Sequence, residues 1–369
     1  MTAARLKTYD MFKKLWVLQW KLSQAAKRNR QKKFGILYDK VWWTETLEEA
    51  WKKVRANRGA GGVDDETIEY IEKEYGVERF LKEIQTELAE KRYRPEKVKR
   101  VWIDKPGRKE KRPLGIPTVK DRVIQMAVKF IIEPILEVDF RECSYGFRPG
   151  RSAHQAIDKV SKYLACGCQW VIDLDIKSCF DSIPHEELIT LLRERITDKW
   201  IIRLIRRWLK AGILDGSRVY YTSIGTCQGA VLSPLLANLY LNQLDRMWEE
   251  RGYANRYKED AQLIRYADDR APRGCTGDEG RPLEAGLQEQ ASNHLKLHWL
   301  RAIVVSVKEK ARQRLCQVSI KEARKGDPLL TCRKRSNDVK TGWESLTQDK
   351  SKSNLFTAWM ASGMKVART

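Results

Sequence analysis

The amino-acid sequence predicts an α+β fold, with helices and a few separate strands. Residues 119–140 carry apolar side chains at helical spacing, and several other stretches share this pattern. Residues 98–117 have the pattern of a strand, a turn and a second strand. Two further short apolar runs, residues 171–176 and 263–267, have the composition of strands and lead into acidic residues. We therefore expect a mixed protein in which strand ends carry the chemistry.

The composition points to a polyanionic partner. The chain has 369 residues, enough for about two or three domains, and 71 Lys and Arg against 49 Asp and Glu give a formal charge of +22. Such an excess favours nucleic acid first and an anionic membrane surface second. No run approaches the roughly 18 apolar residues of a membrane span, and the N-terminus lacks the apolar core of a signal peptide. The sequence thus predicts a cytoplasmic protein with no membrane partner.

The cysteines are scattered and form no C-x-x-C pair, which favours reduced thiols over a zinc site or a disulfide framework. The histidines show no metal-ligand spacing either. His185 follows Ser182-Ile183-Pro184 at an expected helix start, and we predict a surface position for it.

Residues 1–40 alternate basic with aromatic or aliphatic side chains, which predicts one basic amphipathic helix with a frayed basic end. Two roles are open for it. The helix is either an arm that contacts RNA or a helix docked on the core with a solvated basic face. The candidate nucleic-acid contacts in it are Lys13, Lys14, Arg28 and Arg30.

Residues 57–64 form a glycine-containing loop without the spacing or the Lys-Ser/Thr pair of a phosphate-cradling P-loop, so nucleotide hydrolysis gains no support. The strand–turn–strand pattern at 98–117 is strongly basic. We expect it to form a flap over phosphates, which Arg grips at two oxygens and Lys binds as a point charge. A solvated basic hairpin is the alternative.

A turn at 145–152 carries Arg148 and Arg151 ahead of an expected helix over 152–164. Arginines near a helix start suit a nucleic-acid backbone, so both are candidate nucleic-acid contacts. Further helices are expected at 180–195, at 200–209 as a core element, and from Ser233 to Leu244.

The acids at the two strand ends are the candidate catalytic groups. In residues 171–176, alternation places Asp173 and Asp175 on the face opposite the apolar side chains. The second strand ends in Asp268 and Asp269. Adjacent carboxylates repel unless a cation lies on them, although an Asp-rich turn is the plain alternative. If the strands lie side by side, three carboxylates gather into a Mg²⁺ site, because hard cations take oxygen ligands.

A series of motifs runs in order between residues 57 and 269. This succession resembles the reverse transcriptases encoded by group II introns, which also act as splicing maturases. The series consists of Arg112-Pro113-Leu114-Gly115-Ile116-Pro117, Ser144-Tyr145-Gly146-Phe147-Arg148-Pro149, Asp175-Ile176-Lys177-Ser178-Cys179-Phe180-Asp181, Gln228-Gly229 with Ser233-Pro234-Leu235-Leu236-Ala237-Asn238, and Tyr266-Ala267-Asp268-Asp269.

The resemblance implies a right-hand polymerase with the reverse transcriptase fold, its fingers mostly before residue 170 and its palm after it. Asp175, Asp268 and Asp269 look like the metal-binding triad, with the carbonyl of Ile176 as an extra ligand. Two Mg²⁺ ions, or Mn²⁺ in their place, would stabilise the attacking and leaving oxygens when a primer 3′-hydroxyl attacks a nucleotide.

The resemblance also implies a nucleotide site. Lys105 and Arg112 look like the pair that neutralises the triphosphate, and Gln228 is similar to the glutamine near the incoming sugar and base. Phe180 looks like the bulky gate that rejects a 2′-hydroxyl, so we expect a DNA-synthesising enzyme. Asp173 and Asp181 are expected either to support the site from outside it or to have a structural role.

Departures from the family pattern are small within the motifs, where Cys227 replaces a proline and Ala230 a glycine. A larger one begins at Arg270. Residues 270–277 hold proline, glycine and arginines where a palm hairpin needs a returning apolar strand. No thumb or endonuclease is recognisable, and a frameshifted or truncated reading frame would produce this pattern. The expected organisation is a basic extension (1–56), fingers (57–170), a palm (171–269) and an atypical basic tail (270–369).

Two functions from different classes follow. The first is a Mg²⁺-dependent RNA-directed DNA polymerase of a group II intron, with intron RNA, a primed RNA template and dNTPs as partners. The second is a polymerase-inactive, maturase-like remnant that binds intron RNA. Neutralising Asp268 and Asp269 separates them, because RNA binding should survive and synthesis should not. Retron-type and viral RNA-dependent polymerases fit the motifs less well, and the sequence leaves the oligomeric state open.

Overall fold

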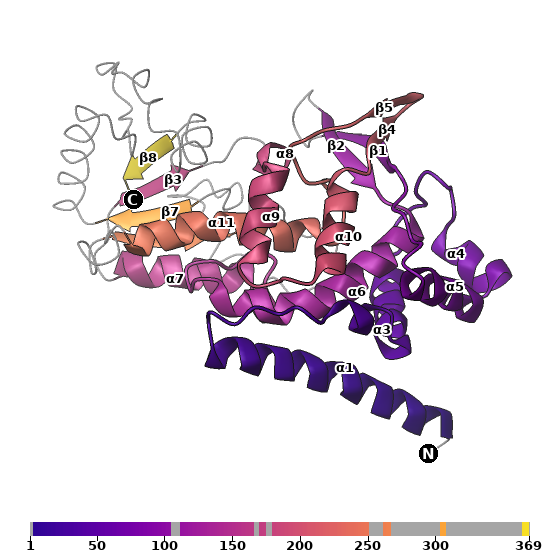
Figure 1. Ribbon diagram of the computed structural model, residues 1–369. Coiled ribbons are helices and arrows are strands. Elements are labelled where there is room, and N and C mark those ends of the chain that lie inside the picture. The colour runs from indigo at the N-terminus through magenta and orange to yellow at the C-terminus, as the bar shows by residue number, and fades with distance from the viewer. Residues whose placement is uncertain are drawn as a thin grey trace, which may run out of the picture. The chain divides into compact units, whose positions relative to one another are not determined.

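The computed structural model describes residues 3–104, 111–165, 170–174, 179–250, 261–266, 303–307 and 364–368 (Figure 1). The chain folds into two compact units that interleave along the sequence. One comprises Met1–Phe140 with Phe180–Tyr240, and the other comprises Arg141–Cys179 with Leu241–Thr369. The domains expected from the sequence are, by contrast, consecutive segments of the chain. Their boundaries after residues 56, 170 and 269 remain predictions.

The first unit is organised around α6 (Val119–Leu136), a helix that is buried along most of its length. Its apolar residues occupy more than one face, which is typical of a helix surrounded by other elements. Thr118 caps it, because the Thr118 hydroxyl accepts a hydrogen bond from the backbone N–H of Asp121 at 3.1 Å. It contacts α1 (Ala3–Arg28), α2 (Tyr38–Val41), α3 (Thr44–Ala56) and η2 (Glu137–Asp139), and α4 (Ile68–Tyr70), η1 (Ile71–Tyr75) and α5 (Val77–Ala89) belong to the same unit.

The N-terminal helix α1 docks on this unit through Leu15, Leu22 and Ala26, which are buried. The single basic amphipathic helix expected here is confirmed, and it ends at Arg28. Arg195 fixes that end, since its guanidinium donates to the carbonyl of Ala26 at 3.2 Å. A cation at a helix C-terminus also offsets the partial negative charge of the last carbonyls.

A four-stranded sheet in the first unit has the strand order β2-β1-β4-β5 (Figure 1). The hairpin expected at 98–117 is confirmed, because β1 and β2 pair antiparallel with Trp102 opposite Pro113. Its turn, residues 105–110, lies outside the described residues. The sequence did not predict β4 or β5, which are too short to show a clear alternation. The strands are β1 (Val98–Asp104), β2 (Lys111–Ile116), β4 (Ile213–Asp215) and β5 (Arg218–Tyr220).

The helix expected over 180–195 is in fact two helices. The break falls at Ile183 and Pro184, because proline has no N–H to donate and disfavours a helical residue before it. The predicted surface position of His185 was wrong. This residue is 2% exposed, and its Nε2 lies 2.7 Å from the carbonyl oxygen of Gly225, so it packs inward where the helix begins. The two helices are α8 (Cys179–Ser182) and α9 (His185–Arg193).

The core helix expected at 200–209 is confirmed, with Ile201 and Ile205 buried. Asp198 caps it, since its Oδ1 accepts a hydrogen bond from the N–H of Trp200 at 2.9 Å. The other carboxylate oxygen accepts from the N–H of Tyr38 at 2.9 Å, so one side chain also ties in the start of α2. This helix is α10 (Lys199–Leu209), and the helix expected to begin at Ser233 is α11 (Ser233–Glu250).

The second unit contains a sheet with the strand order β6-β7-β3-β8. The two acid-ended strands predicted from the sequence are present as β3 and β6. They do not lie side by side as expected, because β7 lies between them and pairs antiparallel with both. Residues 270–277, where no returning strand was expected, lie outside the described residues. The elements of this unit are α7 (Ala153–Ala165), β3 (Trp170–Leu174), β6 (Ala261–Arg265), β7 (Ile303–Val307) and β8 (Met364–Arg368).

Within the part of the chain that the structure describes, no helix has both the length and the apolar character needed to cross a lipid bilayer. The cysteines in the same part are Cys143, Cys179 and Cys227, and no disulfide joins any two of them.

Candidate functional site

The loop at 225–230 joins two elements of the first unit. The carbonyl of Gln228 accepts a hydrogen bond from the backbone N–H of Gly115 in β2 at 2.7 Å. The N–H of Thr226 donates to the carbonyl of Phe180 in α8 at 2.6 Å. The loop therefore holds the basic hairpin and the short helix α8 together through backbone contacts.

Two glycines permit this close approach. Gly225 has a φ of 92° and Gly229 a φ of 118°, in a region that residues with a side chain rarely adopt. A Cβ at Gly225 would lie 2.9 Å from the carbonyl oxygen of Asp181, and a Cβ at Gly229 would collide with the carbonyl of Gly115. The glycines of this motif are therefore required by the contacts of the loop.

Predicted nucleotide-binding residues meet in this group. The Gln228 side chain donates from Nε2 to Oδ2 of Asp181 at 2.8 Å, which orients its amide. Asp181 therefore contacts Gln228 directly, and its role in a nucleotide site stays a prediction. Phe180, its neighbour in α8, is 5% exposed. Arg112 lies on β2, the strand that the loop contacts, and Lys105 lies outside the described residues.

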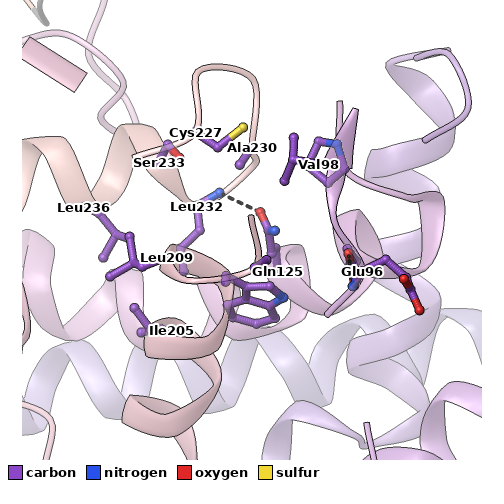
Figure 2. Close-up of a pocket in the computed structure, with 14 residues that line it drawn as sticks. Glu96, Val98, Gln125, Ile205, Leu209, Cys227, Ala230, Leu232, Ser233 and Leu236 are labelled. Carbon is purple, nitrogen blue, oxygen red and sulfur yellow. Dashed lines mark hydrogen bonds between the residues drawn. The ribbon is translucent and has the colours of Figure 1, made fainter. Parts of the chain in front are cut away.

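A cavity of about 30 Å³ lies behind this loop (Figure 2). A volume of this size holds about one or two water molecules and no nucleotide. At one wall, Oε1 of Gln125 accepts a hydrogen bond from the N–H of Leu232 at 3.4 Å. We conclude that the residues around this cavity support the loop. The lining includes Val98, Gln125, Ile205, Cys227, Leu232 and Leu236.

A buried carboxyl group, Asp121, lines the same cavity. The Tyr93 hydroxyl donates to its Oδ1, and its Oδ2 accepts from the N–H of Glu96 at 3.2 Å. Trp208 Nε1 donates in turn to the Tyr93 hydroxyl at 2.9 Å. Burial raises the pKa of the Asp121 carboxyl from 3.8 to about 7, and hydrogen bonds to Tyr93, Glu96 and Thr118 offset only part of that effect.

The buried Asp121 carboxyl should make stability fall as pH rises. In the unfolded chain it ionises near pH 4, whereas in the folded chain it stays protonated up to about pH 7. Unfolding therefore releases a proton between these values, and the stabilisation present below pH 4 is lost as pH rises through 7. The raised pKa corresponds to about 4 kcal/mol at most. Chemical unfolding of the Asp121→Asn variant should show a flatter pH profile than the wild type.

The matched control is Asp104→Asn, because the Asp104 side chain is 84% exposed. Its pH profile should follow that of the wild type. Identical profiles for the wild type and the Asp121→Asn variant would contradict the raised pKa.

In the second unit, the two acid-ended strands stop beside the same residue. Leu174 of β3 and Arg265 of β6 both pair with Ile303 of β7. Because both strands run antiparallel to β7, they point the same way, and the chain leaves both at one edge of the sheet. Strands two places apart in a sheet are separated by about 10 Å. The predicted metal ligands that follow these strand ends, Asp175, Ile176, Asp268 and Asp269, lie outside the described residues.

Arg265 anchors β6 immediately before Tyr266. Its side chain is 1% exposed and forms a two-point ion pair with the fully buried Asp245 of α11, with Nη2–Oδ2 at 2.7 Å and Nε–Oδ1 at 3.0 Å. Its backbone N–H donates to the carbonyl of Cys143, and its carbonyl accepts from the N–H of Tyr145. Burial acts to lower the pKa of Arg265, but the carboxylate of Asp245 outweighs it and the pKa is raised. The guanidinium is therefore permanently charged.

The ion pair was not predicted from the sequence, although two features of the sequence indicate it. Asp245 lies four residues after the buried Leu241, so helical spacing places it on the buried face of α11. Arg265 is a charged residue within an otherwise apolar strand, which likewise indicates a buried charge. A buried acid and a buried base must each find a partner, and each could have been matched with the other.

The arginines of the turn at 145–152 differ in exposure. Arg148 is 7% exposed, and its Nη1 donates to the carbonyls of Arg141 and Ser144 at 2.6 and 2.7 Å. Arg151 is partly exposed and donates to the carbonyl of Glu142 at 2.9 Å. The geometry gives Arg148 a structural role that the sequence did not suggest. Contact of either residue with a nucleic acid stays a prediction.

The candidate nucleic-acid contacts of the N-terminal region are exposed where the structure describes their side chains. Lys14, Arg28 and Arg30 face solvent, and the Lys14 ammonium lies 2.6 Å from a carboxylate oxygen of Glu45. The Lys13 side chain lies outside the described residues. The structure thus contains the docked helix with a solvated basic face, and contact of that face with RNA stays a prediction.

The described ranges contain no group of three or more His, Cys, Asp and Glu that could hold a metal ion. The predicted metal ligands follow the strand ends beside Ile303 and consist of carboxylates and one carbonyl. This donor set suits a hard divalent cation and does not suit one that prefers sulfur.

Residues 103–292, more than half of the chain, match the reverse transcriptase (RNA-dependent DNA polymerase) family. The chain belongs to this family. The matched range includes the end of the basic hairpin, the loop at 225–230 and both acid-ended strands. The expected fold class, the α+β fold of reverse transcriptases, is thereby confirmed. This family comprises RNA-dependent DNA polymerases.

The resemblance to group II intron proteins is confirmed as well. This reverse transcriptase is 38% identical over 228 residues to the group II intron-encoded protein LtrA of Lactococcus lactis subsp. cremoris, across 61% of this chain and 37% of LtrA. It is 36% identical over 249 residues to protein YkfC of Escherichia coli, across 66% of this chain and 65% of YkfC. An uncharacterized 91 kDa protein in the cob intron of Schizosaccharomyces pombe is 39% identical over 202 residues, across 54% of this chain and 24% of that protein.

The reverse transcriptase therefore spans less than two thirds of the length of each of these relatives. Among solved structures, a chain of the partial Cas6-RT-Cas1–Cas2 complex is similar with a TM-score of 0.42 at 19% identity, over 78% of this chain and 43% of that one.

Proposed function

We propose that this reverse transcriptase extends a DNA primer along an RNA template as the polymerase of a group II intron. The observation that carries the proposal is the common edge at which β3 and β6 end, beside Ile303. This edge supports a shared site for the acids that follow each strand. Family membership supplies the reaction class.

Asp175, Asp268 and Asp269 would hold the divalent cations, with the carbonyl of Ile176 as a further oxygen donor. Mg²⁺ is the proposed ion, and Mn²⁺ accepts the same ligands. When bound, two such ions stabilise charge at the attacking and leaving oxygens of the displacement. The ion pair of Arg265 supports this assignment, because it holds β6 rigid just before the acidic motif.

The incoming dNTP would be bound by residues of the first unit. Lys105 and Arg112 neutralise its phosphates, and Gln228, oriented by Asp181, contacts its sugar and base. Phe180 excludes a 2′-hydroxyl by its bulk. The hydrogen bonds that connect β2, the loop at 225–230 and α8 support this assignment, because they hold the elements that carry Arg112, Gln228 and Phe180 together.

Group II intron RNA is the proposed further partner. LtrA is named for a group II intron, and the formal charge of +22 suits a structured polyanion. Binding without polymerisation is the second candidate. It is favoured by one observation, namely that among the described residues β6 pairs with residues 303–307, which follow its acids only after a long intervening segment.

Primer extension tests the proposal. The purified chain is mixed with a DNA primer on an RNA template, dNTPs and Mg²⁺, and RNA affinity is measured in parallel over a range of salt concentrations. We expect extended DNA that is lost with a chelator and restored by Mg²⁺, together with RNA affinity that falls as salt rises. Tight, salt-sensitive RNA binding without any extension would reject polymerisation and leave the binding-only alternative.

A further inference from the structure

One face of the sheet in the first unit gathers aromatic and arginine side chains. Val98 pairs with Ile213, and Ile213 pairs with Tyr220, so these side chains project from the same face. Arg100 and Trp102 follow Val98 at even spacing along β1 and therefore share that face. We call Arg100, Trp102 and Tyr220 the aromatic–arginine face.

The side chains of this face are held in a fixed arrangement. The guanidinium carbon of Arg100 lies 5.7 Å from the ring centroid of Trp102 and 5.9 Å from that of Tyr220. Asp215 holds two of the three, because its Oδ2 lies 3.4 Å from Nη1 of Arg100 and its Oδ1 accepts from Nε1 of Trp102 at 3.3 Å. The face is thus preorganised, with an arginine between two rings.

The rings of this face are largely open to solvent. Trp102 is 48% exposed and Tyr220 is 44% exposed, and the following Tyr221 is 71% exposed. Arg218, on the same strand as Tyr220, is exposed as well. Grouped exposed aromatic side chains with a cation among them are typical of a binding surface.

We propose that the aromatic–arginine face binds single-stranded RNA by base stacking. Unpaired bases stack on aromatic rings and on guanidinium planes, whereas the bases of a duplex are already stacked on one another. Since Asp215 compensates the charge of Arg100, the face contributes stacking, and Arg218 contributes a phosphate contact. The choice of RNA among polyanions rests on the proposed function and agrees with the net charge of +22.

The test is the affinity for a labelled, unstructured single-stranded RNA, measured without metal or dNTPs across a salt series. Trp102→Leu and Tyr220→Leu should each weaken binding about 5- to 100-fold, because each removes one stacking contact. Trp102→Phe should keep most of the affinity.

The slope of log affinity against log salt should be unchanged in these variants, whereas Arg218→Gln should reduce it by about 0.7. The matched control is Tyr70→Leu, at an exposed tyrosine (39%) that is close in sequence to Glu69 and Glu72, and it should bind like the wild type.

Full RNA affinity in both folded leucine variants would overturn the proposal, because the face would then not bind RNA. An equal loss of affinity for duplex RNA would also overturn it, because stacking of unpaired bases would not explain that loss. Two sites on separate strands keep the test valid if one variant fails to fold, which circular dichroism detects. Primer extension on the same preparations separates this inference from the proposed function. A chain that binds but never extends, and whose leucine variants lose binding, would refute polymerisation and support the stacking face.

Discussion

The double variant Asp268→Asn, Asp269→Asn should lose DNA synthesis by at least about 10³-fold while it keeps its RNA affinity. Asparagine preserves the size of both side chains but removes the negative charge that holds divalent cations. Stabilisation of the reacting oxygens by bound cations is worth several kcal/mol, and each 1.4 kcal/mol is about tenfold in rate. Primer extension and RNA binding, measured on the same preparations, check both parts of this expectation.

The control is Asp104→Asn, an exposed acid at the end of β1 that should leave extension unchanged. Equal extension by the wild type and the double variant would mean that these acids do not hold the catalytic cations. Joint loss of synthesis and RNA binding would point instead to a damaged fold.

Replacing Arg265 by leucine should destabilise the second unit by about 3–5 kcal/mol. The change leaves the Asp245 carboxylate at 0% exposure without its partner, and an unpaired buried charge costs about that much. Hydrogen exchange of the peptide that spans β6 should report the loss, because it follows local opening even when the two units unfold separately. Primer extension should fall along with it, since Arg265 directly precedes the acidic motif.

The double variant Arg265→Met, Asp245→Leu provides the decisive comparison. An apolar pair of similar volume often replaces a buried ion pair without loss of stability, because neither group then needs to be desolvated as a charge. Exchange protection and primer extension should therefore return toward wild-type values. If the double variant is no better protected than Arg265→Leu, the destabilisation does not come from an uncompensated charge.

Local patterns made much of the fold predictable from sequence. The hairpin at 98–117 and the helices α1 and α10 are specified by alternation or helical spacing within a few residues, and such signals survive without tertiary context. The strands β4 and β5 were not predicted, because three residues are too few to show a period. The inward position of His185 depends on the distant Gly225, which no local pattern contains.

The candidate site divides in the same way. The Gln-Gly loop and the two acidic strand ends were recognisable because their residue types suit the same chemistry and because they follow one another in a consistent order along the chain. The strand between β3 and β6 was not recognisable, because β7 follows Arg265 only after a long intervening segment. The link from Gln228 to Asp181 and the ion pair of Arg265 needed the fold itself, since each joins residues from separate elements.

The position of β3 between β7 and β8 has a consequence for synthesis on the ribosome. A growing chain exposes β3 long before residues 303–307 and 364–368 exist, so one edge of this strand lacks its partner until residue 307 is made and the other until residue 368. The first unit needs nothing beyond Tyr240 and can form earlier. Unpaired strand edges invite pairing with other chains. Newly made protein should therefore be most exposed to aggregation and proteolysis through the second unit, during the last third of its translation.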